Sequence, residues 1–255
     1  MPMVNVEGEE IYYAQREGDG PPLLFVHGAG GSHRNWAHQL KAIRGARLVA
    51  LDLPGHGRSQ GRGRQTIEEY AHFVLQFISA LDLGRVILVG HSMGGAITLE
   101  LALSHRDALA GLSLVGTGAR LRVLPAILEG LRDDFPATVE LICRYAYAPS
   151  AEEELVRLGK EEMLTNDPQV MWGGFMACDR FDVMERLGEV RLPTLVLCGL
   201  EDKLTPPKYS EFLSHHIEGA RLCLIPGAGH MVMLEKPQEV SRAIEEFIGT
   251  FARTS

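Results

Sequence analysis

Short apolar segments alternate with longer amphipathic segments along most of the chain. Two of the apolar segments, residues 23–26 and 86–89, contain no polar residue. Strands of a parallel sheet have this pattern, because helices cover both faces of such a sheet. The sequence therefore predicts an α/β fold, with strands over residues 4–6, 11–14, 23–26, 48–51, 86–89, 112–115, 195–198 and 222–225.

Several segments between these strands have the spacing of amphipathic helices. Ile67, Tyr70 and Val74 recur at helical intervals. Thr66 precedes them as a helix cap, with Glu69 at the capping-box position. A proline suited to a first helical turn also stands at position 237. We predict helices over residues 66–81, 93–104 and 237–251.

Strand patterns are missing between Gly118 and Leu187, where prolines separate helical patterns. We interpret this stretch as a helical insertion that follows one strand of an α/β core. The expected organisation is a core of residues 1–117 and 188–255 with a helical cap of residues 118–187. The helices predicted in the cap cover residues 123–132, 137–147, 152–165 and 169–178.

The insertion is rich in methionine and aromatic residues, which have two interpretations. They can form a small core of the insertion itself, or some of them can face the active site as an adaptable apolar lid. On the second interpretation, the candidate substrate contacts are Trp172, Phe175 and Met176 of the insertion, together with Leu204 and Met231.

Composition and charge exclude several classes of protein. The chain has 255 residues, of which 45% are hydrophobic and 23% charged, as in ordinary globular proteins. Its formal net charge of −8 argues against a nucleic-acid partner and against docking on an anionic membrane. The first residues do not resemble a secretory signal, and no apolar run approaches the roughly 20 residues that span a bilayer. We expect neither a nucleic-acid nor a membrane partner.

The four cysteines show no Cys-x-x-Cys spacing and no paired framework. Reduced structural thiols are the expected state, and with them a cytoplasmic location. Cys198 and Cys223 lie within apolar segments, which predicts buried and inert side chains.

The strongest chemical motif is the sequence Gly-His-Ser-Met-Gly-Gly, which places Ser92 between a predicted strand and a predicted helix. A sharp turn there exposes the central side chain, and flanking glycines give room for the neighbouring backbone. The hydroxyl then lies near a helix N-terminus, where negative charge is stabilised. We therefore predict that Ser92 is a nucleophile.

A serine nucleophile needs a base, and that base needs a carboxylate partner. His230 follows a predicted strand in a glycine-rich loop, at the sheet edge where α/β proteins form their sites. Asp202 follows the preceding strand in the same way, with Glu201 as its rival. The order of serine, aspartate and histidine along the chain is the order expected for this architecture.

An oxyanion intermediate also needs backbone N–H donors. Met93 follows the nucleophile and supplies one of them. The loop after residues 23–26 is rich in small residues, which lets the backbone approach a substrate closely, and we assign the second donor to Ala29.

Other polar residues have structural interpretations. We expect His91 and His27 to support the loops around the site. Asp52, His56 and Ser59 contain the residue types of a triad, but their close spacing on one loop favours a hydrogen-bonded turn.

Nothing in the sequence indicates a metal or a cofactor. The pair His215-His216 lacks neighbouring cysteine or carboxylate ligands, so a solvent-facing helix end is expected. No phosphate-binding or dinucleotide-binding glycine motif is present.

Taken together, the motifs resemble the α/β-hydrolase superfamily over nearly the full chain. The matching segments are residues 27–31 and 52–59 and the loops of Ser92, Asp202 and His230. The resemblance implies a mostly parallel eight-stranded sheet flanked by helices, with an antiparallel second strand and a helical cap inserted after strand six. Members that act on epoxides or haloalkanes have Asp at the position of Ser92, so those activities are not expected. The His-Gly-Gly-Gly run of some esterases is absent, which argues against esters of bulky tertiary alcohols.

The expected function is hydrolysis of small to medium carboxylic esters through an acyl-enzyme. Carbon–carbon bond hydrolysis of the meta-cleavage type uses the same triad and is an alternative, as are lactonase, thioesterase and acyltransferase activities. A ligand receptor on the same fold is the non-enzymatic alternative. The expected partner is a small-molecule ester, and the oligomeric state cannot be read from the sequence.

Overall fold

The computed structural model describes residues 2–251. Its centre is an eight-stranded sheet with the order β1-β2-β4-β3-β5-β6-β7-β8. The strands are β1 (Met3–Val6), β2 (Glu9–Arg16), β3 (Leu23–Val26), β4 (Leu48–Leu51), β5 (Val86–His91), β6 (Leu109–Val115), β7 (Thr194–Gly199) and β8 (Arg221–Ile225).

Only β2 runs against the rest of the sheet. It pairs antiparallel with both β1 and β4, and the pairs from β4 through β8 are parallel. The predicted α/β fold with an antiparallel second strand is therefore confirmed. Parallel neighbours align their carboxyl ends at one edge, so the loops after β3, β5, β6, β7 and β8 leave the sheet on the same side.

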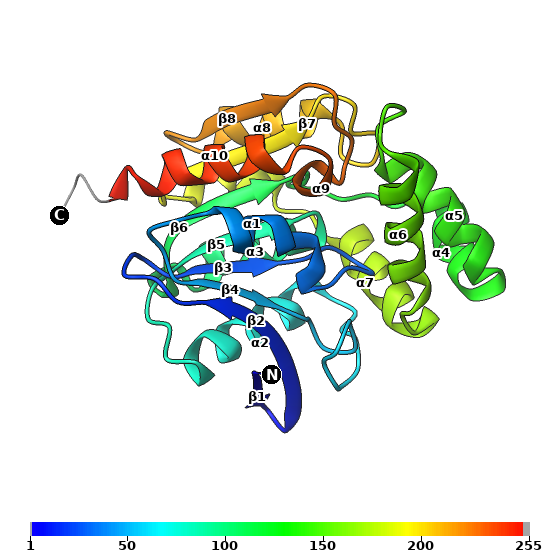
Figure 1. The fold of residues 1–255 in the computed structure, drawn as a ribbon, viewed down its shortest axis with the longest axis horizontal. Helices are drawn as coiled ribbons and strands as arrows, with labels where there is room; N and C mark the ends of the chain where they lie inside the picture. Colours follow the sequence, from blue (N-terminus) through cyan, green and yellow to red (C-terminus); the bar gives the residue numbers. More distant parts are fainter. Residues whose placement is uncertain (1, 252–255) are drawn as a thin grey trace.

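Helices cover both faces of the sheet (Figure 1). One face carries α1 (Ala37–Ala42), α9 (Val232–Glu235) and α10 (Pro237–Ile248), and the other carries α2 (Ile67–Ala80), α3 (Met93–Ser104) and α8 (Pro207–His216). Within β3, Leu23 and Phe25 pack on the first face, whereas Leu24 and Val26 pack on the second. The strand is apolar at every position because both of its faces are buried.

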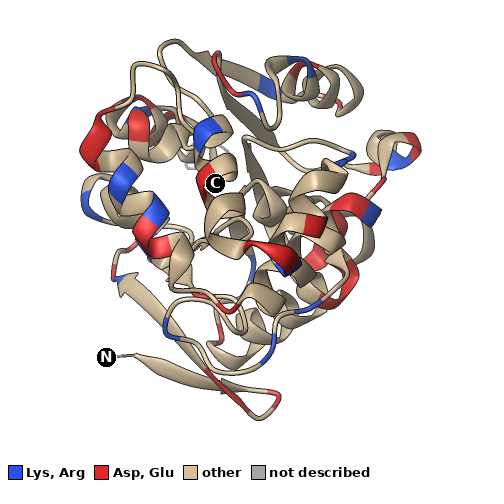
Figure 2. Cartoon of the chain, turned by 90° about the vertical axis from the view of Figure 1, so that its right-hand side faces the viewer, with Lys and Arg blue, Asp and Glu red and all other residues tan. Residues whose placement is uncertain are grey.

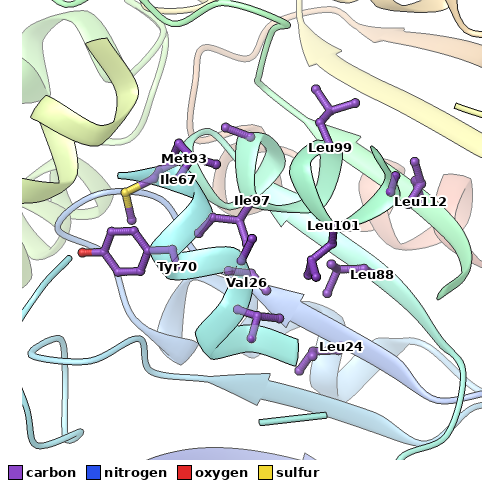
Figure 3. Close-up of a cluster of buried hydrophobic side chains, with 14 of the residues drawn as sticks. Leu24, Val26, Ile67, Tyr70, Leu88, Met93, Ile97, Leu99, Leu101 and Leu112 are labelled. Atoms are coloured by element: carbon purple, nitrogen blue, oxygen red, sulfur yellow. The ribbon is translucent and has the colours of Figure 1, made fainter. Parts of the chain in front are cut away.

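The larger core lies between the sheet and the helices α2 and α3 (Figure 3). Thr66 and Glu69 form the predicted capping box at the start of α2. Helix α3 is buried along almost its whole length and extends directly from the end of β5 through Ser92. This burial holds the turn at Ser92 firmly against the sheet.

Four helices lie in the chain between β6 and β7: α4 (Pro125–Asp133), α5 (Phe135–Ala146), α6 (Glu153–Leu164) and α7 (Pro168–Arg180). They pack beside the carboxyl edge of the strands, at the right of Figure 1. Short 3₁₀ segments complete the described chain: η1 (His33–Trp36), η2 (Arg106–Ala108) and η3 (Met184–Glu189). We call α4–α7 the helical segment.

Three short helices were not predicted in full from the sequence: α1, α8 and the four-residue α9. Helix α1 buries only the polar Gln39, and α8 buries only Ser210 and Leu213. Both are too short and too polar to produce a clear apolar period. Helix α8 ends at His216, which agrees with the helix end predicted there.

All four cysteines are free thiols. Cys198 is buried as predicted, but the prediction for Cys223 is wrong because this side chain is only half-buried. It belongs to β8, which is the edge strand of the sheet and is partly exposed. Within residues 2–251, no helix combines the length and the apolar character needed to cross a membrane.

Candidate active site

Ser92 occupies a strained turn between β5 and α3. Its backbone has φ 54° and ψ −116°, a left-handed region that non-glycine residues rarely adopt. The Ser92 N–H donates to the carbonyl of Val115 at 2.9 Å, and its carbonyl accepts from Thr117 Oγ1 at 2.8 Å. These two bonds hold the turn in its strained conformation. That conformation places the serine side chain at the carboxyl edge of the sheet.

The glycines around Ser92 permit backbone contacts that no other residue would allow. A Cβ at Gly90 would lie 2.1 Å from the carbonyl oxygen of Gly94, and a Cβ at Gly94 would lie 2.4 Å from that of Val26. Both distances are far below van der Waals contact. The motif therefore has a steric basis, since α3 and β3 approach the turn too closely for any side chain.

His230 and Asp202 form a buried pair. Nδ1 of His230 lies 2.9 Å from Oδ2 of Asp202. A carboxylate can only accept, so Nδ1 carries the proton and Nε2 retains its lone pair. An imidazole held in this tautomer can act as a base through Nε2.

Further hydrogen bonds orient the carboxylate of Asp202. Oδ1 accepts from the N–H groups of Leu204 at 2.9 Å and Thr205 at 2.8 Å, while Thr205 Oγ1 donates to Oδ2 at 2.8 Å. Burial alone would raise the pKa of Asp202, but His230 and these donors lower its pKa below the usual value. Asp202 is thus held as an anion beside the histidine. The contribution of Thr205 was not predicted from the sequence.

Ser92 and His230 line the same cavity, which has a volume of about 330 Å³. Within the described chain, no hydrogen bond joins Ser92 Oγ to the ring of His230. Such bonds are often long without substrate and tighten when it binds. The structure therefore brings the three predicted side chains to one site and links two of them directly.

The two predicted oxyanion donors also lie at this site. Ala29 lines the cavity, and Met93 begins α3 directly after Ser92. Neither N–H donates to another residue within the part of the chain that the structure describes. Both amides are therefore free to bind an oxyanion.

Three of the five candidate substrate contacts, Phe175, Leu204 and Met231, line the cavity. Trp172 and Met176 do not: Trp172 packs instead under the guanidinium of Arg132, 4.0 Å from its ring. Trp172 and Phe175 are three positions apart on α7 and pack against the same small cluster, but only Phe175 reaches the cavity. The sequence predicts that this segment is a helix, but it does not predict which face of the helix points toward the cavity.

A comparison with protein families agrees with this geometry. The family model described as "Alpha/beta hydrolase family" matches residues 23–243. The chain belongs to the alpha/beta hydrolase family.

This α/β hydrolase is similar to two proteins named as esterases and to one named as an acetyltransferase component. A solved structure called a thermophilic esterase is 38% identical, with a TM-score of 0.89, and the match covers 98% of this chain and 97% of the other. The pimeloyl-[acyl-carrier protein] methyl ester esterase of Vibrio vulnificus is 27% identical over 92% of this chain and 97% of its own length. The acetyltransferase component of the acetoin cleaving system of Cupriavidus necator is 30% identical over 96% of this chain but 68% of its own length.

Two histidines support the loops of this hydrolase, as predicted. His91 Nε2 donates to the carbonyl of His230 at 3.0 Å, and burial lowers the pKa of His91 well below its usual value, so the ring is neutral. His27 Nδ1 donates to the carbonyl of Gly28 at 2.7 Å, and its Nε2 accepts from the N–H of Leu53 at 3.0 Å. Each ring connects a loop of the site to a neighbouring loop.

Asp52 is the centre of a second hydrogen-bonded loop, again as predicted. Its Oδ1 accepts from the N–H of His33 at 2.6 Å and from Nδ1 of the same residue at 2.8 Å. Its Oδ2 accepts from the N–H of Arg58 at 2.9 Å, and Ser59 Oγ donates to its carbonyl at 2.7 Å. Burial alone would raise the pKa of Asp52, but the hydrogen bonds from His33 and Arg58 and the nearby ring of His27 lower its pKa below the usual value.

This lowered pKa predicts acid sensitivity. An unfolded Asp titrates near 3.9, so below about pH 4 the unfolded chain binds a proton that native Asp52 does not. Stability from Asp52 is therefore complete above that pH and is lost as the pH falls through the native pKa. We expect Asp52→Asn to lower the free energy of unfolding by about 1–3 kcal/mol at pH 7, with the difference shrinking below about pH 4. Urea denaturation from pH 3 to 7 measures this.

The exposed carboxylate of Asp107 provides the control for this experiment. Asp107→Asn should change stability little at any pH, because an exposed ion pair contributes little. A constant difference between wild type and Asp52→Asn down to pH 3 would contradict the prediction.

Glu235 connects the histidine loop to the helical segment. Its Oε1 accepts from the N–H of Gly229 at 3.0 Å, and its Oε2 accepts from the N–H of Ala148 at 2.9 Å. The N–H groups of His230 and Met231 also donate to the carbonyl of Ala146, at 2.8 and 3.1 Å. This bridge was not predictable from the sequence, because its two ends lie far apart in the chain.

We expect Glu235→Gln to weaken both stability and catalysis. A glutamine accepts through only one of the two positions, so one N–H loses its partner. Because burial raises the pKa of Glu235 and so offsets part of its benefit, the expected loss is about 1–2 kcal/mol. Chemical denaturation and kcat on a simple ester measure the two effects. Glu239→Gln, which changes an exposed carboxylate on α10, should leave both unchanged; wild-type values in Glu235→Gln would refute this role.

Proposed function

We propose that this chain is a carboxylic ester hydrolase with Ser92 as nucleophile, His230 as general base and Asp202 as the carboxylate that orients the histidine. The main support is the strained Ser92 turn, which opens into the same cavity as the buried Asp202–His230 pair. The esterase names among its relatives support the same class of reaction.

The mechanism follows from the positions of these groups. Nε2 of His230 removes the proton of Ser92 as its hydroxyl oxygen attacks the ester carbonyl. The N–H groups of Ala29 and Met93 bind the oxyanion, and donors of this kind each contribute about 10²–10³ in rate. The protonated His230 then gives its proton to the leaving alcohol, and a water molecule activated by His230 releases the acid.

We also propose that residues 118–187 act as a cap over a core of residues 1–117 and 188–255. The cavity is lined on one side by loops at the carboxyl edge of the sheet and on the other by side chains of the helical segment, such as Ile127, Ile142 and Phe175. A volume of about 330 Å³ lies at the lower end of the range for small-molecule sites and suits small to medium esters.

A series of p-nitrophenyl esters from acetate to dodecanoate tests the proposal. We expect turnover of the short and medium esters and a decline for the longest chains, which exceed the cavity. Inactivation by an organophosphonate should remove the activity. Failure on every ester, combined with hydrolysis of a vinylogous diketone, would instead favour carbon–carbon bond hydrolysis.

A further inference from the structure

Three polar side chains line one region of an otherwise mainly apolar cavity. Asn35 lies in η1, just after the loop that carries Ala29, and the other two, Tyr147 and Glu162, come from the helical segment. None of the three takes part in the proposed mechanism.

Asn35 is buried, with 4% of its surface exposed, and its backbone N–H donates to the carbonyl of Ser32. Its side-chain amide has no hydrogen-bond partner within residues 2–251, yet the residue lines the cavity. Unlike the sealed side-chain atoms that have no partner in the described chain, such as Trp36 Nε1, this amide is open to the cavity. The amide is therefore available to a ligand.

Glu162 brings a carboxylate to the same region. One of its oxygens accepts a hydrogen bond from the buried Ser32 Oγ, which fixes the carboxylate across the interface between α6 and the core. Neither Arg157 nor Lys160, the basic residues of α6, pairs with it; they bind Glu154, Glu161 and Glu140 instead. The second oxygen of Glu162 thus remains available as an acceptor.

The hydroxyl of Tyr147 completes the group. This side chain is 5% exposed and lies against α6, where its oxygen would be 1.9 Å from a Cβ placed on Gly159. Within the described residues it makes no side-chain hydrogen bond. The region therefore offers a hydroxyl, an amide and an anionic acceptor from three different elements.

We propose that these three residues form a subsite for a hydrogen-bond-donating group on the substrate, either a hydroxyl, an amide N–H or an ammonium. The inference rests on the proposed ester hydrolysis and specifies its substrate class. A carboxylate provides acceptors alone, and its charge disfavours an anionic substituent. A purely alkyl chain would leave the polar groups without partners, which is the usual basis of strong discrimination by buried polar sites.

The cavity also has basic residues, which favour the opposite charge. Arg122, Lys203 and Lys208 line it but are exposed to solvent. Charges in water interact weakly, whereas Asn35 is buried and the Ser32–Glu162 contact is part-buried. Acidic and basic residues are interspersed over the helices on this side of the molecule, so no single sign dominates its surface (Figure 2).

Matched substrates test the subsite. One series consists of p-nitrophenyl esters of hexanoic, 6-hydroxyhexanoic, 6-aminohexanoic and adipic acids. The second consists of acetates of the corresponding substituted alcohols, whose hydrolysis is measured by the release of acid. The two series together place the substituent on either side of the ester bond. In at least one series we expect the hydroxy and amino chains to exceed the alkyl chain about tenfold in kcat/KM, with the carboxylate chain lowest.

Glu162→Gln should reduce the preference for the amino chain about tenfold, and Asn35→Leu should reduce the preference for the hydroxy chain. Glu161→Gln, which removes the neighbouring exposed carboxylate, should leave every ratio unchanged. Ratios rather than absolute rates separate a specificity role from a general loss of folding. Equal or better turnover of the alkyl chains in both series, or an unchanged ratio in Glu162→Gln, overturns the subsite alone. Absence of turnover of every ester overturns the proposed function and this inference with it.

Discussion

Replacing Ser92 by alanine is expected to reduce kcat by at least about 10³-fold and to abolish covalent labelling by an organophosphonate. Without the hydroxyl, no acyl-enzyme can form, and only binding and the oxyanion donors remain to promote attack by water. Steady-state turnover of p-nitrophenyl butyrate and mass spectrometry of the phosphonate-treated protein measure the two effects.

Ser104 provides a matched control at the other end of α3. Its hydroxyl donates to the carbonyl of Glu100 at 2.7 Å, far from the cavity, so Ser104→Ala should retain both activity and labelling. Because alanine keeps the Cβ and removes only a hydroxyl that makes no hydrogen bond within residues 2–251, the alanine variant should fold about as well as the wild type. Labelling that persists in Ser92→Ala would remove this residue from the mechanism.

Asp202→Asn is expected to lower kcat by about 10³–10⁴-fold. The asparagine can present its NH₂ group toward His230 Nδ1, which favours the tautomer with the proton on Nε2. That nitrogen could then no longer accept the proton of Ser92. The variant should still bind substrate, so the effect should appear in kcat far more than in KM, as steady-state kinetics would reveal.

The neighbouring carboxylate supplies the control. Glu201 is the rival that the sequence could not exclude. Its contact with the loops of the site is a hydrogen bond from its backbone N–H to the carbonyl of Ala228 at 2.9 Å. Glu201→Gln should therefore retain nearly full activity. A large loss in Glu201→Gln with little change in Asp202→Asn would exchange the two assignments.

Residues that directly follow an apolar strand pattern could be identified from the sequence. Ser92 and Asp202 each follow a buried apolar strand, and His230 follows the partly exposed edge strand β8; the parallel arrangement of β5, β7 and β8 places all three at one edge. The strand residues themselves were predictable because burial on both faces leaves no polar position. Fold and reaction class therefore follow from short-range information.

Contacts between distant segments could not be predicted in this way. Asn35 and Glu162 meet at one cavity although more than a hundred residues separate them, and nothing in either local sequence indicates the other. Trp172 illustrates a related limit. Its helix was predicted, but a rotation of about 100° per residue decides which side chains face the cavity, and that rotation depends on packing against the core.

The bridge through Glu235 constrains how product can leave. The loop of His230 donates two backbone N–H groups to the carbonyl of Ala146 at the end of α5, and Glu235 of α9 accepts one N–H from Gly229 of that loop and one from Ala148. Outward swinging of the four helices about a distant point would break these contacts and displace His230 at every turnover. A hinge located at residues 146–148 avoids that cost, so the exit path should widen at the opposite side, around α6 and α7.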